Sequence, residues 1–259
     1  MMNLPCAKDM KMKDIKKNIR SLFGRFFDFL YPPACVGCGV LLDDVGAFCP
    51  ECLSEYEQEK QRNCPHCFRV LQACDCPTAE MRKRGAKHLY KVFPYHPTNR
   101  EKKTNQLIYA LKDMHLYHAS KFVADEMYMS LLLGDVRLSD YVLTYIPASK
   151  TRMVKRGYNQ MKMVAKCLGE LGGCPIEAPL YRTREGTPQK SLPTSKRFEN
   201  TKGIFSVKKS SSVAGKKYII IDDIATSGAT LMAAAATLRE AGADHVIFAT
   251  AALTIRTHI

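Results

Sequence analysis

Eight of the eleven cysteines fall in one short stretch of this 259-residue chain, in four close pairs. These are Cys35 and Cys38, Cys49 and Cys52, Cys64 and Cys67, and Cys74 and Cys76. Closely paired thiolates converge on one ion, and two such pairs give zinc its tetrahedral structural site. The preceding residues have lysines and an arginine where an export signal would be apolar, so metal binding is favoured over disulfides.

The order of the pairs predicts two successive zinc ribbons. Ten residues separate Cys38 from Cys49, and six separate Cys67 from Cys74. We expect one structural zinc on Cys35, Cys38, Cys49 and Cys52, and another on Cys64, Cys67, Cys74 and Cys76. A cross-braced pairing is the alternative. Because so short a segment builds little core, zinc is expected to fold it.

The charge of the chain is strongly positive, at +14 from 39 Lys and Arg against 25 Asp and Glu. Such an excess favours nucleic acid, phosphate esters or anionic lipid as partners, with general solubility as the plain alternative. We find no apolar run long enough for a transmembrane segment, and we expect a cytoplasmic protein. Residues 12–30 predict a basic amphipathic helix that either packs on the protein or lies peripherally on the inner face of the membrane.

The order of elements predicts an α/β fold. Apolar strands are expected at 89–95, 141–146, 217–221 and 245–252, and helices at 100–112, 119–133, 158–171 and 229–241. Such alternation predicts a parallel sheet with helices on both faces. We divide the chain into an amino-terminal helix (1–34), a double zinc ribbon (35–80) and the α/β domain (81–259). Residues 80–87 are expected to form a basic linker, and 206–217 a surface turn.

The most informative motif runs from residue 218 to 230. An apolar strand leads into Asp222 and Asp223, and a small, hydroxylated turn then opens a helix. Ligands of parallel sheets bind beyond the carboxyl ends of the strands, and the bare amides at a helix start attract anions. Carboxylates would repel a phosphate but accept hydrogen bonds from vicinal ribose hydroxyls. The predicted phosphate-binding turn comprises Ala225, Thr226, Ser227, Gly228, Ala229 and Thr230.

Two other nucleotide-binding interpretations of the chain fail. An NTPase needs a Walker A sequence in addition to a strand that ends in acidic residues, and the chain has none. A dinucleotide fold needs a third glycine, which is missing beside Gly37 and Gly39.

This segment resembles the signature with which type I phosphoribosyltransferases bind phosphoribosyl pyrophosphate (PRPP). Residues 147–152 and 155–160 resemble the ComF family, as do Arg184, Thr187, Gln189, Leu192, Arg197, Asn200, Gly203 and Phe205. With the cysteine block, the likeness spans roughly residues 20 to 255 and implies a ComFC- or GntX-type protein. Tyr145 stands where the family often has proline, and Ser227 replaces a commoner threonine.

The resemblance also implies roles for residues outside the motif. Ala148, Ser149 and Lys150 would meet pyrophosphate, and Arg197, in a loop over 184–200, would neutralise its charge. Arg152 and Arg156 would add phosphate contacts, unless they form a solvated basic face. Asn159 and Gln160 are candidate substrate contacts, and no catalytic residue is assigned. Magnesium would be held mainly by PRPP oxygens and water.

Three functions compete at this point. The first is a PRPP-dependent phosphoribosyltransferase whose acceptor the sequence does not identify. The second is a nucleic-acid handling protein, since the resemblance implies natural competence, with single-stranded DNA and the DNA-uptake machinery as partners. The third is a PRPP sensor without turnover. We expect a phosphoribosyl ligand to bind and the protein to serve DNA uptake.

Overall fold

The computed structural model describes residues 33–43, 46–112, 117–184 and 194–255. Its central sheet has four parallel strands in the order β1-β6-β5-β2. The strands are β1 (Leu89–Tyr95), β2 (Val142–Tyr145), β5 (Lys217–Ala225) and β6 (His245–Thr254). All four were predicted, but β5 extends beyond its predicted end at residue 221. Its last residues remain paired, with Asp222 opposite Thr250 and Ala225 opposite Leu253.

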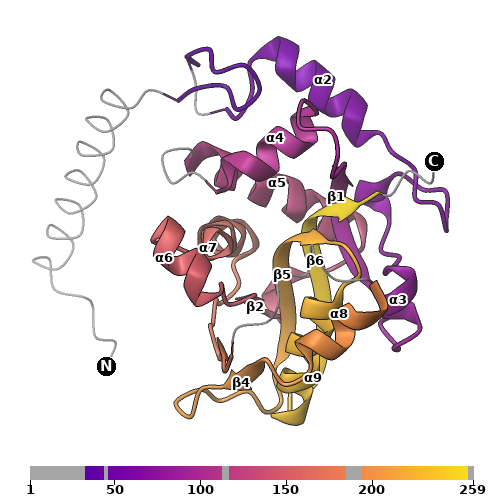
Figure 1. Ribbon diagram of the computed structural model, residues 1–259, viewed down its shortest axis with the longest axis vertical. Coiled ribbons are helices and arrows are strands. Elements are labelled where there is room, and N and C mark those ends of the chain that lie inside the picture. The colour runs from indigo at the N-terminus through magenta and orange to yellow at the C-terminus, as the bar shows by residue number, and fades with distance from the viewer. Residues whose placement is uncertain (1–32, 44–45, 113–116, 185–193, 256–259) are drawn as a thin grey trace, which may run out of the picture.

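Helices cover both faces of this sheet, which confirms the predicted architecture (Figure 1). On one face, α5 (Tyr117–Leu133) and α7 (Gln160–Gly172) pack over Ile219 and Ile221. On the other, α9 (Ala229–Glu240) packs over Tyr218 and Ile220. These β5 side chains alternate between the two cores, as the pleat of a strand requires.

The cysteine region adds further helices to this body. It contains α2 (Pro50–Lys60) and the short 3-10 helix η1 (Leu71–Ala73). The helix α3 (Ala79–Arg82) follows it, and α4 (Lys103–Ala110) follows β1. Tyr56 of α2 is fully buried, and its ring contacts Phe93 of β1 and Phe122 of α5. The amino-terminal part of the cysteine region therefore belongs to the main core, while the predicted boundaries at residues 34 and 80 stay predictions.

Several elements differ from the expectation. Residues 150–156 form α6 (Lys150–Arg156), and the expected surface turn begins only after β4 (Phe205–Val207), which pairs antiparallel with β3 (Leu180–Arg182). A helix α8 (Thr194–Thr201) and a 3-10 helix η2 (Leu138–Asp140) were also not predicted. The expected linker at 80–87 includes the end of α3, and Met81 there is fully buried.

The predicted amino-terminal helix lies outside the described residues. Among the helices that the structure does describe, none has the length and apolar character needed to cross a bilayer.

Candidate functional site

Two carboxylates lie at the carboxyl end of β5. The side chains of Asp222 and Asp223 are both half-buried, and each accepts a hydrogen bond from the amide of the next residue, at 3.0 and 2.8 Å. Although successive side chains of a strand alternate, the two carboxylates lie close enough here to interact, because Asp223 acts on Asp222 through its charge and its side chain. The Asp223 carboxylate faces α7, where it accepts a hydrogen bond from Gln160 at 3.4 Å. The pair therefore stands at the sheet edge where the motif analysis predicts a ligand.

Burial and the neighbouring acid change the protonation of Asp222. Desolvation raises its pKa well above the ordinary value of 3.8, and the negative charge of Asp223 raises it further. A hydrogen bond from the Asp223 amide and the positive charge of Arg152 act in the opposite direction. The site therefore favours hydroxyl donors, or a cation, beside Asp222.

The turn after β5 leads directly into α9. Gly228 precedes the first residue of the helix and has a left-handed φ of +81°, which glycine adopts without strain. The side chains of Thr226 and Thr230 are half-buried, whereas Ser227 is only 3% exposed and its hydroxyl accepts from the Ala229 amide at 3.4 Å. Ala225 and Ala229 are buried beside them. The expected turn and helix start are present, and the first amides of such a helix have no partners within it.

Two residues that follow the cysteine block hold this turn from outside. The Thr78 hydroxyl donates to the Ser227 carbonyl at 2.9 Å. The Met81 side chain lies so close to Gly228 that a Cβ on the glycine would meet its sulfur at 2.2 Å. Glycine at 228 is thus required both by its backbone angle and by its neighbour.

The neighbouring strand β2 presents the predicted pyrophosphate loop at the same edge. Pro147 and Ala148 follow the strand, and the Ser149 hydroxyl caps α6 by accepting from the Arg152 amide at 3.3 Å. Lys150 and Arg152 are exposed, and no residue of α6 is buried. This basic helix ends at Gly157, whose φ is +75°.

Polar side chains connect α6 to the acids. Arg156 donates to the side-chain oxygen of Gln160 at 3.0 Å, and the side-chain nitrogen of Gln160 donates to Asp223. Burial and the charge of Arg152 lower the pKa of Arg156, while Asp223 opposes this shift. Asn159 donates to the Ile146 carbonyl and caps α7 by accepting from the Met161 amide. Its amide is therefore already used in holding the backbone.

The predicted closing loop is described only at its ends. Residues 185–193, including Thr187, Gln189 and Leu192, lie outside the described residues. Arg184 donates to the Lys202 carbonyl at 3.0 Å. Arg197 is buried on α8, next to Phe198, whose ring lies 3.7 Å from the Arg84 guanidinium.

The eight predicted ligands form two separate groups of four cysteines. One comprises Cys35, Cys38, Cys49 and Cys52, and the other Cys64, Cys67, Cys74 and Cys76; within each, all sulfurs lie within 4.8 Å of one another. A tetrahedral zinc with Zn–S bonds of about 2.3 Å needs sulfurs roughly 3.8 Å apart. The Cys38–Cys49 and Cys67–Cys74 sulfurs are 3.8 and 3.4 Å apart. Both groups could hold zinc, and the grouping is the sequential one, not the cross-braced one.

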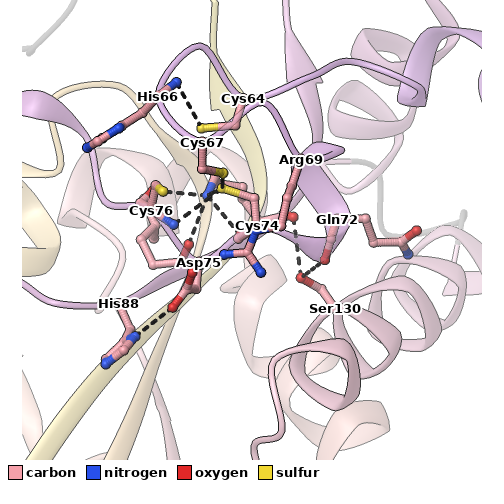
Figure 2. A network of polar contacts seen from close by, with 12 residues as sticks. Cys64, His66, Cys67, Arg69, Gln72, Cys74, Asp75, Cys76, His88 and Ser130 are labelled. Atoms are coloured by element: carbon pink, nitrogen blue, oxygen red, sulfur yellow. Dashed lines mark hydrogen bonds and ion pairs between the residues drawn. The ribbon is translucent and has the colours of Figure 1, made fainter.

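A buried lysine reaches the second group from the sheet. Lys91 of β1 is 0% exposed, and its ammonium group donates to the Cys74 sulfur at 3.0 Å and to the carbonyls of Cys74 and Cys76, both at 2.9 Å. Figure 2 shows the surrounding polar network, in which Asp75 pairs with Arg69 and His88. A lysine within an apolar strand is the one signal of this contact that the sequence contains, and it does not by itself predict a role for Lys91.

The chain has recognisable relatives. Residues 174–257 match the phosphoribosyl transferase domain family. Competence protein ComFC of Streptococcus pneumoniae is 28% identical over 215 residues, which cover 80% of this chain and 88% of that protein. Competence protein ComFC of Bacillus subtilis is 30% identical over 208 residues, which cover 75% of this chain and 78% of that protein. A solved phosphoribosylpyrophosphate synthetase from Mycobacterium smegmatis matches 52% of this chain and 33% of its own, at 24% identity and a TM-score of 0.31.

Proposed function

The chain belongs to the ComF family and has a phosphoribosyltransferase-type fold, and on this premise we propose that it binds PRPP or a related ribose 5-phosphate and acts in DNA uptake. One observation carries the ligand proposal. The carboxylates of Asp222 and Asp223 and the start of α9, which Gly228 precedes, lie at the same edge of the sheet. They belong to one continuous β–turn–α unit. The acids would accept hydrogen bonds from the ribose hydroxyls, and the turn 225–230 would surround the 5-phosphate.

The basic helix α6 supports a second anionic contact. In the proposal, the residues 148–150 meet the pyrophosphate, with the exposed Lys150 and Arg152 supplying positive charge. Arg156 and Gln160 would orient Asp223 through the hydrogen bonds described above. Mg²⁺ would be bound mainly by oxygens of the ligand and by water, and it would neutralise pyrophosphate charge.

Two further assignments complete the proposal. The cysteine groups would hold two structural zinc ions, because both offer four sulfurs at zinc-like spacing. The role in DNA uptake rests on the two ComFC relatives and on the net charge of +14, which favours single-stranded DNA as a partner. Such a protein would work in the cytoplasm or on the inner face of the membrane.

Calorimetric titration of Mg·PRPP into the zinc-loaded protein tests the ligand site. We expect the double substitution Asp222→Asn and Asp223→Asn to weaken binding at least tenfold, because each acid accepts from a ribose hydroxyl. Asp244→Asn is the matched control, since Asp244 lies just before the amino end of β6, at the opposite edge of the sheet. Equal affinity in the double variant and the control would remove the pocket assignment.

The raised pKa of Asp222 predicts a pH-dependent stability difference. Ionisation of a group whose folded-state pKa is raised opposes folding, so the fold loses stability as the pH rises above about 4. Asp222→Asn should therefore unfold at a higher temperature than wild type at pH 7–8 and at a similar one near pH 4, as measured by circular dichroism. The reverse trend would mean that the acid is stabilised in its ionised form.

Release of pyrophosphate separates the enzyme from the sensor. If the protein is a phosphoribosyltransferase, PRPP and the correct acceptor base or nucleotide will yield free pyrophosphate. Binding of Mg·PRPP with no release over a panel of bases and nucleotides would favour the sensor function.

A further inference from the structure

The two cysteine groups begin with knuckles of the same backbone design. In the first, the Gly39 amide donates to the Cys35 carbonyl at 2.8 Å; in the second, the Phe68 amide donates to the Cys64 carbonyl at 2.9 Å. A second pair of hydrogen bonds also matches. The Cys35 amide donates to the Val40 carbonyl and the Cys64 amide to the Arg69 carbonyl, both at 2.8 Å. Gly39 and Phe68 are therefore equivalent positions.

This position requires a left-handed backbone, which suits the first knuckle and not the second. The φ angle is +79° at Gly39 and +60° at Phe68. Glycine adopts this conformation freely, whereas a bulky side chain there is a genuine outlier. The Phe68 side chain also gains little packing in return, since the residue is 76% exposed. A strained, exposed aromatic ring is more useful to a binding partner than to the fold.

The surroundings of Phe68 indicate the chemistry of that partner. Arg62, Pro65, His66 and Arg69 are exposed around the same knuckle. Arg69 pairs with Asp75 at 2.9 Å. Arg62 is a further exposed positive charge at the base of this hairpin, where its carbonyl accepts from the Leu71 amide. An aromatic face beside positive charge is the combination that binds single-stranded nucleic acid, because the ring stacks on a base and the cations meet phosphates. A protein partner that docked an aliphatic surface on Phe68 would instead require apolar residues around the ring.

The knuckle is also fixed at the sheet edge that carries the proposed ligand site. The small core of the second cysteine group, formed by Cys64, Leu71 and Cys74, packs against Leu253 and Ile255 at the end of β6. β6 pairs with β5 up to Ala225, where the phosphate-binding turn begins. A nucleic-acid strand bound at the knuckle would therefore lie at the edge of the sheet where the parallel β-strands have their carboxyl ends.

We propose that Phe68 is the stacking anchor of a single-stranded nucleic-acid site at the tip of the second knuckle, with Arg62 and Arg69 contacting the backbone. The proposal deepens the role in nucleic-acid handling and rests on it. The occupant is an unpaired strand, because the faces of duplex bases are already stacked on one another.

Fluorescence anisotropy with a labelled oligothymidylate and the zinc-loaded full chain tests this proposal. We expect Phe68→Gly to bind roughly 5- to 20-fold more weakly, with an unchanged or higher unfolding temperature, because the strain is relieved. Phe68→Trp should keep wild-type affinity, since it keeps a ring. Leu41→Ala is the matched control, because Leu41 is a 64% exposed apolar residue beside the first knuckle.

Each outcome separates the proposals. Wild-type affinity in Phe68→Gly would overturn the anchor and leave the nucleic-acid role intact. A wild-type chain that binds no oligothymidylate would overturn both, while the Mg·PRPP titration would still test the ligand site on its own. Equal competition by a duplex of the same length would overturn stacking, and wild-type Mg·PRPP affinity in Phe68→Gly would support a separate site.

Discussion

The two cysteine groups offer the same four ligands and share a knuckle backbone, yet they are built into different parts of the molecule. Cysteines of the first group are buried in the main core together with Phe48 and Tyr56, whose stacked rings lie 5.2 Å apart. The second group has only a small core of its own around Leu71. Besides the packing of that core on Leu253 and Ile255, polar contacts connect this region to the rest: Lys91 of β1 donates to Cys74, and Thr78, just after Cys76, donates to the turn before α9.

The difference shows how one kind of site can serve two purposes. Zinc in the first group would complete a core that also contains β1 and α5, so its loss should affect the whole fold. Zinc in the second group would hold the segment that carries Thr78 and Met81 against the turn 225–230, the proposed phosphate site. Its loss should therefore affect the ligand site before it affects the sheet.

Paired Cys→Ser substitutions give the largest expected effects. A structural zinc contributes about 10 kcal/mol or more, which is comparable to the whole stability of a domain. Cys35→Ser with Cys38→Ser should therefore prevent folding. Cys64→Ser with Cys67→Ser should leave the sheet folded but abolish measurable Mg·PRPP binding. Zinc content, circular dichroism and calorimetry would test this.

Either of two results would contradict that assignment. If both double variants unfolded alike, the two groups would not differ in purpose. If the second variant stayed folded and kept its PRPP affinity, the turn would not depend on the second group.

The buried lysine gives the next largest effect. Lys91→Met removes the donor that the Cys74 sulfur and three carbonyls share, so we expect a loss of about 3–5 kcal/mol in unfolding free energy. The zinc ion of the second group should pass to a chelator at least tenfold faster than it does from the wild-type protein. Lys103→Met is the control beside the first group, where the ion pair with Glu55 is 3.5 Å long and should contribute less than about 1 kcal/mol. Equal chelation rates in the two variants would refute this difference.

The contact between Thr78 and the turn gives a smaller, more local effect. Thr78→Val removes the hydrogen bond to Ser227 and the cap of α3, together about 1–2 kcal/mol, and should weaken Mg·PRPP binding roughly fivefold. Thr78→Ser should restore it. Thr237→Val is the control, since that hydroxyl bonds the Ala233 carbonyl late in α9. A loss of stability without any loss of affinity would make Thr78 merely structural.

Patterns with a clear period or a known ligand set were predictable from the sequence. The bounds of β1 and the start of α9 agree with the expectation, because apolar strands and a glycine-started helix leave strong local signals. The grouping of the cysteines follows their order along the chain. The acids and the turn were predicted to share one sheet edge, as they do.

Elements without a regular apolar face were not predictable in the same way. Helix α6 buries no residue, so its sequence has no helical period, although the Ser149 cap and Gly157 were available as signals. Helix α2 lies within the cysteine block and was not predicted, although the proline at its first position is a typical helix-start signal. The contacts of Thr78, Met81 and Lys91 join segments far apart in the chain, and only the tertiary structure brings them together.

The smallest effect tests the knuckle equivalence itself. A Cβ at Gly39 would meet no atom within 4 Å, so any cost of Gly39→Ala must come from the left-handed backbone. We expect a loss of roughly 1 kcal/mol in unfolding free energy, measured by urea denaturation of the zinc-loaded protein. Phe68→Gly should show no loss in the same assay. If Gly39→Ala were neutral, a left-handed φ at this position would carry no strain, and the exposed Phe68 ring would need no partner to explain it.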